Sequence, residues 1–365
     1  MKKALIVITI AIAIVFAAFS MLAHGNATSS PTAQETITGD WTAKVRETQR
    51  GIVLWLSLNR NTDAGKGRFQ MSSDFPLQDF TGLNPNANSN VQFTLQREAG
   101  VVLFDGLFKD GRGVGDFKFT PNGGFISTMR NLGYDDLSVE KLFSMTMHDV
   151  STRFINELKS FGYDKVPVNK LISMRIHGVN GDFIRRMQAI GYKDIPGDKL
   201  ISMRIHGVDE KFIKEVEAMG YKDLPVDKLI SMRIHNINAE TISKAKALGY
   251  GDLPLNKLFT MQIHNIDEEF VKSVQALGYN NLPFDKLVSM RIHNVNGKFI
   301  KEVEEMGFSN VPVDKLISMR IHGVDETFAK EMKDQGFSNL SIDDLIKLRI
   351  HGVDSNYIRR MRGVR

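Results

Sequence analysis

Hydrophobic and polar residues alternate along the segment from about Gly39 to Pro121. Apolar side chains take every second position in IVLWLSL (52–58) and in VQFTL (91–95), as they do in strands with one buried face. The stretch VVLFDGLFKDGRGVGDFKF (101–119) predicts two further strands, joined through KDGRG. Residues 39–121 are therefore expected to form a small antiparallel β domain of five or six strands. Between the strands, FTGLNPNANSN (80–90) is expected to be a loop.

The same domain contains a cluster of glycines, Gly106, Gly111, Gly113 and Gly115, that superficially suggests a phosphate-binding loop. A phosphate loop ends in GK[ST] and opens a helix. Neither feature follows here, so the glycines predict a β-hairpin.

From residue 122 the pattern changes to a repeat of 29 residues. Two residue types mark the period. They are the glycines Gly133, Gly162, Gly191, Gly220, Gly249, Gly278, Gly307 and Gly336, and the histidines His148, His177, His206, His235, His264, His293, His322 and His351. Residues 122–365 thus comprise eight full repeats and a terminal half-repeat.

Residues 209–236 show what one repeat predicts. Phe212, Ile213, Val216 and Met219 share one face of a first helix, which ends at Gly220. Asp209 is its expected N-cap, and every copy has an equivalent residue of a capping type. These equivalents are Ser151, Asn180, Asn238, Asp267, Asn296, Asp325 and Asp354.

A second helix is predicted over DKLISMRIH, with Pro225 at its first position and Asn236 at its C-terminal cap. Ser138 and Ser341 replace the proline in two copies. Each repeat is thus a helical hairpin too short to bury its own apolar face, and stacked hairpins complete the core. The predicted fold class is α+β, a small antiparallel β domain followed by an all-α solenoid.

The recurring histidine lies at the end of the second helix. On the helical wheel it falls away from Leu229, Ile230 and Ile234, so it need not be deeply buried. Its ring can serve the free carbonyls of the helix end, which makes the row structural. A row that contacts ligand and a metal ladder are the alternatives, although no carboxylate recurs at a spacing that would complete a metal site. Catalysis is disfavoured because a catalytic residue is needed once.

An arginine precedes the histidine by two residues in most repeats, and falls inside the apolar arc of the second helix. The residues are Arg175, Arg204, Arg233, Arg291, Arg320 and Arg349, with Thr146 and Gln262 at the other two positions. We expect a buried brace between repeats that binds a loop carbonyl or an aspartate such as Asp223; an arginine row facing an acidic ligand is the alternative. The methionines Met145, Met174, Met203, Met232, Met261, Met290 and Met319 are expected in the core.

The N-terminal sequence predicts where the protein is localised. Residues 1–27 carry two lysines, a long apolar run from Ala4 to Ala23 and then small residues, which predicts a secretory signal or an uncleaved membrane anchor. In both cases the rest of the chain lies outside the cytoplasm. Residues 28–38 are small and polar, as in a linker. The chain has no cysteine and a net charge of +5 without a basic stripe, so we expect no disulfide and no nucleic-acid partner.

The phrase LRIHGV, following LGY and a Pro or Ser helix start, resembles repeats in bacterial exported proteins. Similar repeats occur in the C-terminal extracytoplasmic regions of membrane metallopeptidases of the β-lactam-sensor type. FTLQREAGVVLFDGLF and GVGDFKF also resemble the region that precedes the repeats there. The resemblance implies a periplasmic sensing or scaffolding module. It transfers no catalytic or metal residue, because this chain lacks the HExxH zinc helix.

Together these patterns predict a non-enzymatic, extracytoplasmic binding or scaffold protein without a cofactor. Its partner is expected to be a protein, a peptide or an envelope ligand. The candidate contacts are cations on the first helices, namely Arg185, Arg186, Lys211, Lys214 and Lys301, with the histidine row second. One rival is an envelope enzyme whose site combines Asp79, Asp105, Asp116 or His148 in or beside the β domain. Another is a regulatory or sensor partner of a membrane peptidase.

Overall fold

A computed structural model describes residues 36–49, 51–61, 68–251 and 253–363. The expected signal or anchor (1–27) and most of the expected linker lie outside these residues. Across the part of the chain that is described, no helix combines the length and apolar character needed to cross a membrane. The chain divides into two compact units, residues 1–201 and 202–365, which are considered separately below.

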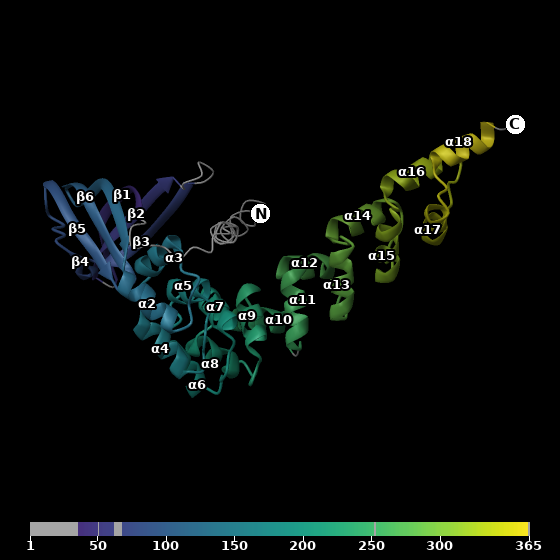
Figure 1. Ribbon diagram of the computed structural model, residues 1–365. Coiled ribbons are helices and arrows are strands. Elements are labelled where there is room, and N and C mark those ends of the chain that lie inside the picture. Colours follow the sequence, from purple (N-terminus) through teal and green to yellow (C-terminus); the bar gives the residue numbers. More distant parts are fainter. Residues whose placement is uncertain (1–35, 50, 62–67, 252, 364–365) are drawn as a thin grey trace. The chain divides into compact units, whose positions relative to one another are not determined.

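A seven-stranded antiparallel sheet forms the first part of unit 1 (Figure 1). The strand order is β3-β2-β1-β7-β6-β5-β4. The strands are β1 (Ile37–Thr48), β2 (Gly51–Asn61), β3 (Arg68–Pro76), β4 (Phe80–Thr81), β5 (Ser89–Arg97), β6 (Gly100–Lys109) and β7 (Arg112–Pro121), with a short 3-10 helix, η1 (Leu77–Asp79), before β4.

Two boundaries differ from those predicted. The sheet has more strands than the expected five or six, partly because β4 is only two residues long and lies in the expected loop, where so short a strand leaves no alternating pattern. The sheet also begins at Ile37 and not at Gly39. Ile37 is buried opposite Phe119 of β7, so the last two residues of the expected linker belong to β1.

Aromatic side chains fill the inner face of the curled sheet. Trp41 packs edge-on against Phe93 at 5.3 Å between ring centroids, and stacks on Phe108 at 6.3 Å. The glycine cluster makes room for this tryptophan, because a Cβ at Gly106 would lie 2.9 Å from its ring. The glycines thus belong to the β6–β7 hairpin, as predicted, and the domain interior is occupied by its own side chains.

The helical repeats follow the sheet directly. In unit 1 the helices are α2 (Gly123–Asn131), α3 (Val139–Met147), α4 (Thr152–Ser160), α5 (Val168–Ile176) and α6 (Gly181–Ala189), and α7 (Gly197–His206) crosses the division between units. Unit 2 contains α8 (Glu210–Ala218), α9 (Val226–Ile234), α10 (Ala239–Ala247), α11 (Leu255–Ile263), α12 (Glu268–Gln275), α13 (Phe284–Ile292), α14 (Gly297–Glu305), α15 (Val313–His322), α16 (Glu326–Asp334), α17 (Ile342–Ile350) and α18 (Ser355–Gly363). Even numbers are the first helices of the hairpins and odd numbers the second.

Local signals fix the helix ends. Asp209 accepts a hydrogen bond from the Phe212 N–H at 2.9 Å, and its equivalents cap the other first helices in the same way. Gly220 and its copies have positive φ, as expected for the residue that ends a helix. Pro225 lies one position earlier than predicted. It is the N-cap itself, with extended backbone, and its carbonyl accepts the N–H groups of Lys228 and Leu229.

The two kinds of helix form separate rows within unit 2. Figure 1 shows α12, α14 and α16 along one side and α13, α15 and α17 along the other. The second helices pack against one another in sequence, with α13 on α15 and α15 on α17. The methionine row is buried throughout, which confirms its place in the core (Met145, Met174, Met203, Met232, Met261, Met290 and Met319).

Candidate binding surface

The arginine row joins neighbouring repeats. Arg233 donates from Nε to the carbonyl of Gly207, the residue that ends the preceding second helix, at 3.0 Å. Its guanidinium carbon lies 3.9 Å from the ring centroid of Phe212. Four other arginines of the row make the same two contacts. Each donates to a carbonyl of the preceding repeat, Arg175 to residue 148, Arg291 to residues 264 and 265, Arg320 to residue 294 and Arg349 to residue 323. Each also covers a phenylalanine ring, in the same order Phe154, Phe270, Phe299 and Phe328.

The expected brace is therefore present, but it is not buried. Arg233 is exposed, and Arg291 keeps 32% of its side chain accessible. The partner common to these arginines is a backbone carbonyl. Two of them also reach an aspartate other than Asp223, since Arg175 donates to Asp149 at 2.5 Å and Arg291 lies 3.7 Å from Asp267. The shared carbonyl contact follows from geometry, since a helix end presents unpaired carbonyls and a planar guanidinium can donate to one of them while it covers an aromatic ring.

In the first repeat a residue from the sheet also binds the helix end that Arg175 reaches. Thr146 occupies the arginine position and donates only to the Leu142 carbonyl within its own helix. Arg97 of β5 donates to the carbonyls of Thr146 and Met147, both at 3.1 Å, and to Asp79 at 2.7 Å. The β domain thus closes the first end of the helical array.

The repeat formed by α10 and α11 lacks both partners of the brace. Thr241 replaces the phenylalanine and Gln262 the arginine, and the Thr241 hydroxyl donates to the free carbonyl of Asn236 at 2.9 Å. A hollow of about 630 Å³ lies beside these two shorter side chains. Its other lining residues are Lys244, Leu248, Met261, Asn265, Ile266, Asp267, Glu268, Glu269 and Lys272.

The histidines of the repeat are half-buried, apart from the exposed His351. His235 packs edge-on against Phe259 of the next repeat at 5.7 Å between ring centroids. Burial, followed by the charges of Arg97 and Arg175, lowers the pKa of His148 to about 4. Within the described ranges, no three His, Cys, Asp or Glu side chains are grouped so as to hold a metal ion.

In every repeat after the first, the residue just before the histidine is an exposed isoleucine; in the first repeat Met147 takes this position and is only 2% exposed. The isoleucine row comprises Ile176 in unit 1 and Ile205, Ile234, Ile263, Ile292, Ile321 and Ile350 in unit 2, each 49–55% accessible. The sequence placed Ile234 in the buried arc with Leu229 and Ile230. That placement is wrong for Ile234, because neighbouring hairpins cover Leu229 fully and Ile230 nearly so but leave the last turn of the helix open.

A ladder of ion pairs accompanies the isoleucine row. Lys257 of α11 pairs with Asp285 of α13 at 2.9 Å, Lys286 pairs with Asp314, and Lys315 pairs with Asp343. Each aspartate precedes an isoleucine of the row by seven residues, or two helical turns, and so shares its face. The exposed face of the second helices therefore has an apolar row bordered by charge.

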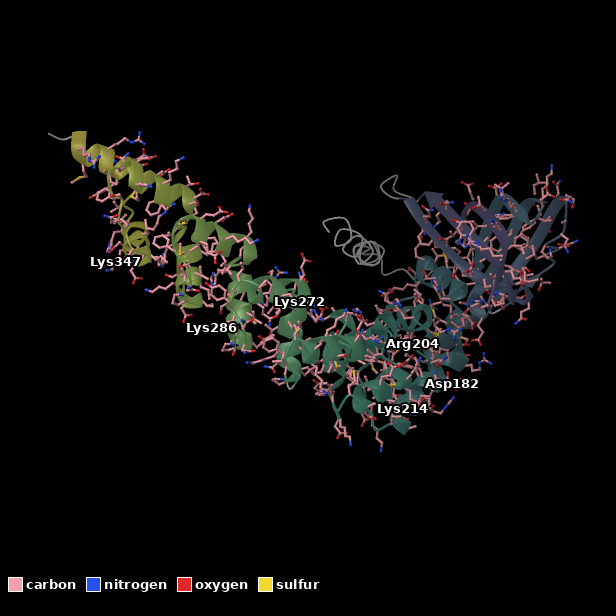
Figure 2. The ribbon with its side chains drawn as sticks, turned by 180° about the vertical axis from the view of Figure 1, so that it is seen from behind. Asp182, Arg204, Lys214, Lys272, Lys286 and Lys347 are labelled. Carbon is pink, nitrogen blue, oxygen red and sulfur yellow. The ribbon has the colours of Figure 1, made fainter. Side chains whose placement is uncertain are left out.

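The five cations predicted as contacts are exposed, and three of them form ion pairs. Arg185 pairs with Asp182, Lys214 with Glu210 at 2.6 Å, and Lys211 with Glu215 at 3.9 Å, each within its own helix. Arg186 and Lys301 are exposed on α6 and α14. Figure 2 labels Lys214 on α8 and Lys272 on α12, which are separate first helices.

The residues of the predicted enzyme site fall into two groups. Asp79 and His148 both lie near Arg97, where Asp79 is held in an ion pair. Asp105 and Asp116 are direct cross-strand partners on the outer face of the sheet, and Asp40 is paired with Asp116 on its other side. All three of these outer carboxylates are exposed.

Comparisons with models of known protein families, with curated proteins and with solved structures gave no match. The argument for function therefore rests on the surface of the chain itself.

Proposed function

We propose that the protein is a non-enzymatic binding or scaffold protein of the extracytoplasmic space, which presents its helical repeats to a protein partner. The observation that carries this proposal is the isoleucine row. Single exposed apolar residues are ordinary on protein surfaces, but the same residue half-exposed at the same position in successive repeats forms a patterned apolar surface. Repeat proteins use such continuous surfaces for binding.

Three further features support the proposal. The N-terminal sequence has the pattern of an export signal or anchor. The resemblance of the repeats to extracytoplasmic sensor regions agrees with an extracytoplasmic localisation. A regulatory role beside a membrane peptidase is one form of the same binding function. The aromatic filling of the β domain favours binding over the alternative of an envelope enzyme, since it leaves the interior no room for a substrate.

The test is affinity capture from an envelope fraction with the full-length protein and two sets of variants. Ile234→Asp/Ile292→Asp/Ile350→Asp alters the isoleucine row, and Lys211→Glu/Lys214→Glu/Lys301→Glu alters the predicted cations. We expect the isoleucine set to lose the captured protein and the lysine set to retain it. Loss with the lysine set alone would move the binding surface to the first helices. Absence of any reproducible partner would contradict the proposed function.

A further inference from the structure

Three kinds of side-chain contact recur at the joints between successive hairpins of unit 2, each joint being named by its two second helices. The first is the arginine bond to the preceding helix end, present at α7–α9, α11–α13, α13–α15 and α15–α17. The second is the lysine–aspartate ion pair, present at α11–α13, α13–α15 and α15–α17. The third is a tyrosine hydroxyl that donates to a carbonyl of the next repeat, from Tyr250 to Leu282 at 2.6 Å and from Tyr279 to Val311 at 2.7 Å.

None of the three contacts is present at the α9–α11 joint among the residues that the structure describes. Gln262 takes the place of the arginine, and Asn256 takes the place of the aspartate that would pair with Lys228. Tyr221 keeps the tyrosine, but its hydroxyl makes no hydrogen bond to the Leu253 carbonyl within the described ranges. Three independent substitutions or losses therefore fall on the same joint.

Ring contacts remain at this joint. His235 of the preceding repeat packs edge-on against Phe259 of α11 at 5.7 Å between ring centroids, and the Lys228 ammonium lies 5.7 Å from the centre of the same ring. Such contacts tolerate a range of geometries, whereas a hydrogen bond weakens steeply away from its preferred distance and angle. The α9–α11 joint thus keeps attraction between its hairpins and lacks the contacts that fix their angle.

The first helix of the same hairpin is also loosely packed. Thr241 and Ala245 of α10 are buried at the positions where α12 has Phe270 and Val274. The hollow of about 630 Å³ is lined by residues of α10, α11 and α12, so there is open space beside these small side chains. Few buried apolar atoms in a helix are typical of a segment that opens locally.

In a stack of repeats each unit contacts only its neighbours, so the stack yields first at its weakest joint. We propose that the α9–α11 joint is a hinge of unit 2, at which the hairpins on its two sides change their angle to one another. The hinge lies between Ile234 and Ile263 and divides the isoleucine row into two segments. A partner that contacts both segments selects one angle of the hinge. The hinge itself does not rest on the proposed binding function, because the missing contacts are all within the chain.

The test measures distances across the joints with pairs of spin labels on introduced cysteines. The chain has no cysteine of its own, and the isoleucine row supplies exposed labelling sites. Ile205→Cys/Ile263→Cys spans the α9–α11 joint. The control, Ile292→Cys/Ile350→Cys, is also two repeats long and spans joints that have the arginine bond and the ion pair. We expect double electron–electron resonance to give a distance distribution at least about twofold wider for the first pair.

Restoring contacts at the hinge should narrow its distribution. Thr241→Phe/Asn256→Asp/Gln262→Arg supplies the arginine with its ring and a partner for the lysine of α9. The converse variant, Asp314→Asn/Arg320→Gln, removes the same two kinds of contact at α13–α15 and should widen the control distribution. Equal widths for the two label pairs would overturn the hinge. So would a wide distribution that the restoring variant leaves unchanged.

A second measurement uses the full-length protein without any substitution. Hydrogen exchange followed by mass spectrometry should show the amides of α10 and α11 exchanging at least about tenfold faster than those of α12 and α13, because opening of the joint exposes the loosely packed hairpin. Equal protection of the two hairpins would overturn the proposal. Neither measurement involves a partner, so the hinge and the binding function stand or fall separately.

Discussion

Arg320 donates from Nε and from a terminal nitrogen to the carbonyl of Asn294, at 3.1 and 3.0 Å. The two residues belong to successive hairpins, and the same guanidinium covers the ring of Phe299 at 4.3 Å. One side chain therefore satisfies the end of the preceding second helix and packs on the first helix of its own repeat.

Replacing this arginine should weaken unit 2. We expect Arg320→Ala to lower the free energy of unfolding by about 1–2 kcal/mol, from a charge-assisted hydrogen bond and a cation–π contact. Arg320→Lys should recover only part of the loss, because an ammonium lacks the planar fork. Urea unfolding followed by far-UV circular dichroism measures both. Arg360→Ala, on exposed α18, is the control, and an equal effect in the two alanine variants would contradict the brace.

Restoring the missing brace should have the opposite effect. In Thr241→Phe/Gln262→Arg the new guanidinium can bind the Asn236 carbonyl, which Thr241 now occupies, and can cover the new ring. We expect the double variant to gain about 1 kcal/mol in stability, while each single variant gains nothing or loses stability. A double-mutant cycle by urea unfolding gives the coupling energy between the two sites. A coupling energy of zero would show that the pair does not act as a unit.

His148 should make unit 1 less stable in mild acid. Its pKa is lowered from 6.5 to about 4 in the folded protein, so the unfolded chain takes up the proton first. Above about pH 6.5 His148 is neutral in both states and does not lower the free energy of unfolding. As the pH falls from 6.5 towards 4 the free energy of unfolding decreases, by about 1–2 kcal/mol at pH 5.

The measurement compares urea unfolding of the normal chain and His148→Gln at about pH 7 and pH 5. Both tryptophans, Trp41 and Trp55, lie in the β domain, so their fluorescence reports unit 1. The variant should show a smaller loss of stability than the normal chain, whereas His351→Gln, at an exposed position in unit 2, should leave the difference unchanged. Equal losses with and without His148 would refute the prediction.

The three outer carboxylates of the sheet should repel one another. Asp116 lies between Asp40 and Asp105 on adjacent strands, and like charges directly opposite are destabilising. We expect Asp116→Asn to raise the unfolding free energy of unit 1 by about 0.5–1 kcal/mol. The gain should shrink at high salt, which screens exposed charges. Glu47→Gln on β1 is the matched control, and a salt-independent effect of Asp116→Asn would argue against repulsion.

Close strand approach at the glycine hairpin gives a packing prediction. A Cβ at Gly115 would overlap the carbonyl oxygen of Asp105 on the neighbouring strand, whereas a Cβ at Gly123 meets nothing within 4 Å. Gly115→Ala should therefore cost about 2–3 kcal/mol of stability, as overpacking does. Gly123→Ala should change little. Tryptophan fluorescence during thermal unfolding distinguishes the two, and a neutral Gly115→Ala would mean that the strands separate easily.

The repeat could be predicted closely because its signals are local. Asp209 and Gly220 mark the ends of a helix through their own backbone and side-chain geometry, which needs no distant partner. Pro225 was misplaced by one position, because a proline fits both the cap and the first turn. The period of 29 residues then identified the hairpin and its expected stacking.

The exposed face could not be predicted in this way. A helical wheel places Ile230 and Ile234 together, but only the neighbouring hairpins decide which of them is covered. Met147, at the position of the isoleucine row in the first repeat, is buried, a difference from Ile234 that the helical wheel does not show. The predicted cations are exposed, yet Lys211 and Lys214 pair within their own helix, a relationship that exposure alone does not reveal.

The brace points backwards along the chain. Arg233, Arg320 and Arg349 each reach a carbonyl 26 residues earlier, so a hairpin is fastened by its successor. During synthesis from the N-terminus, a completed hairpin therefore gains its arginine hydrogen bond only after the following hairpin has been synthesised. Assembly of the array consequently has a direction, and a chain cut short leaves its newest hairpin the loosest.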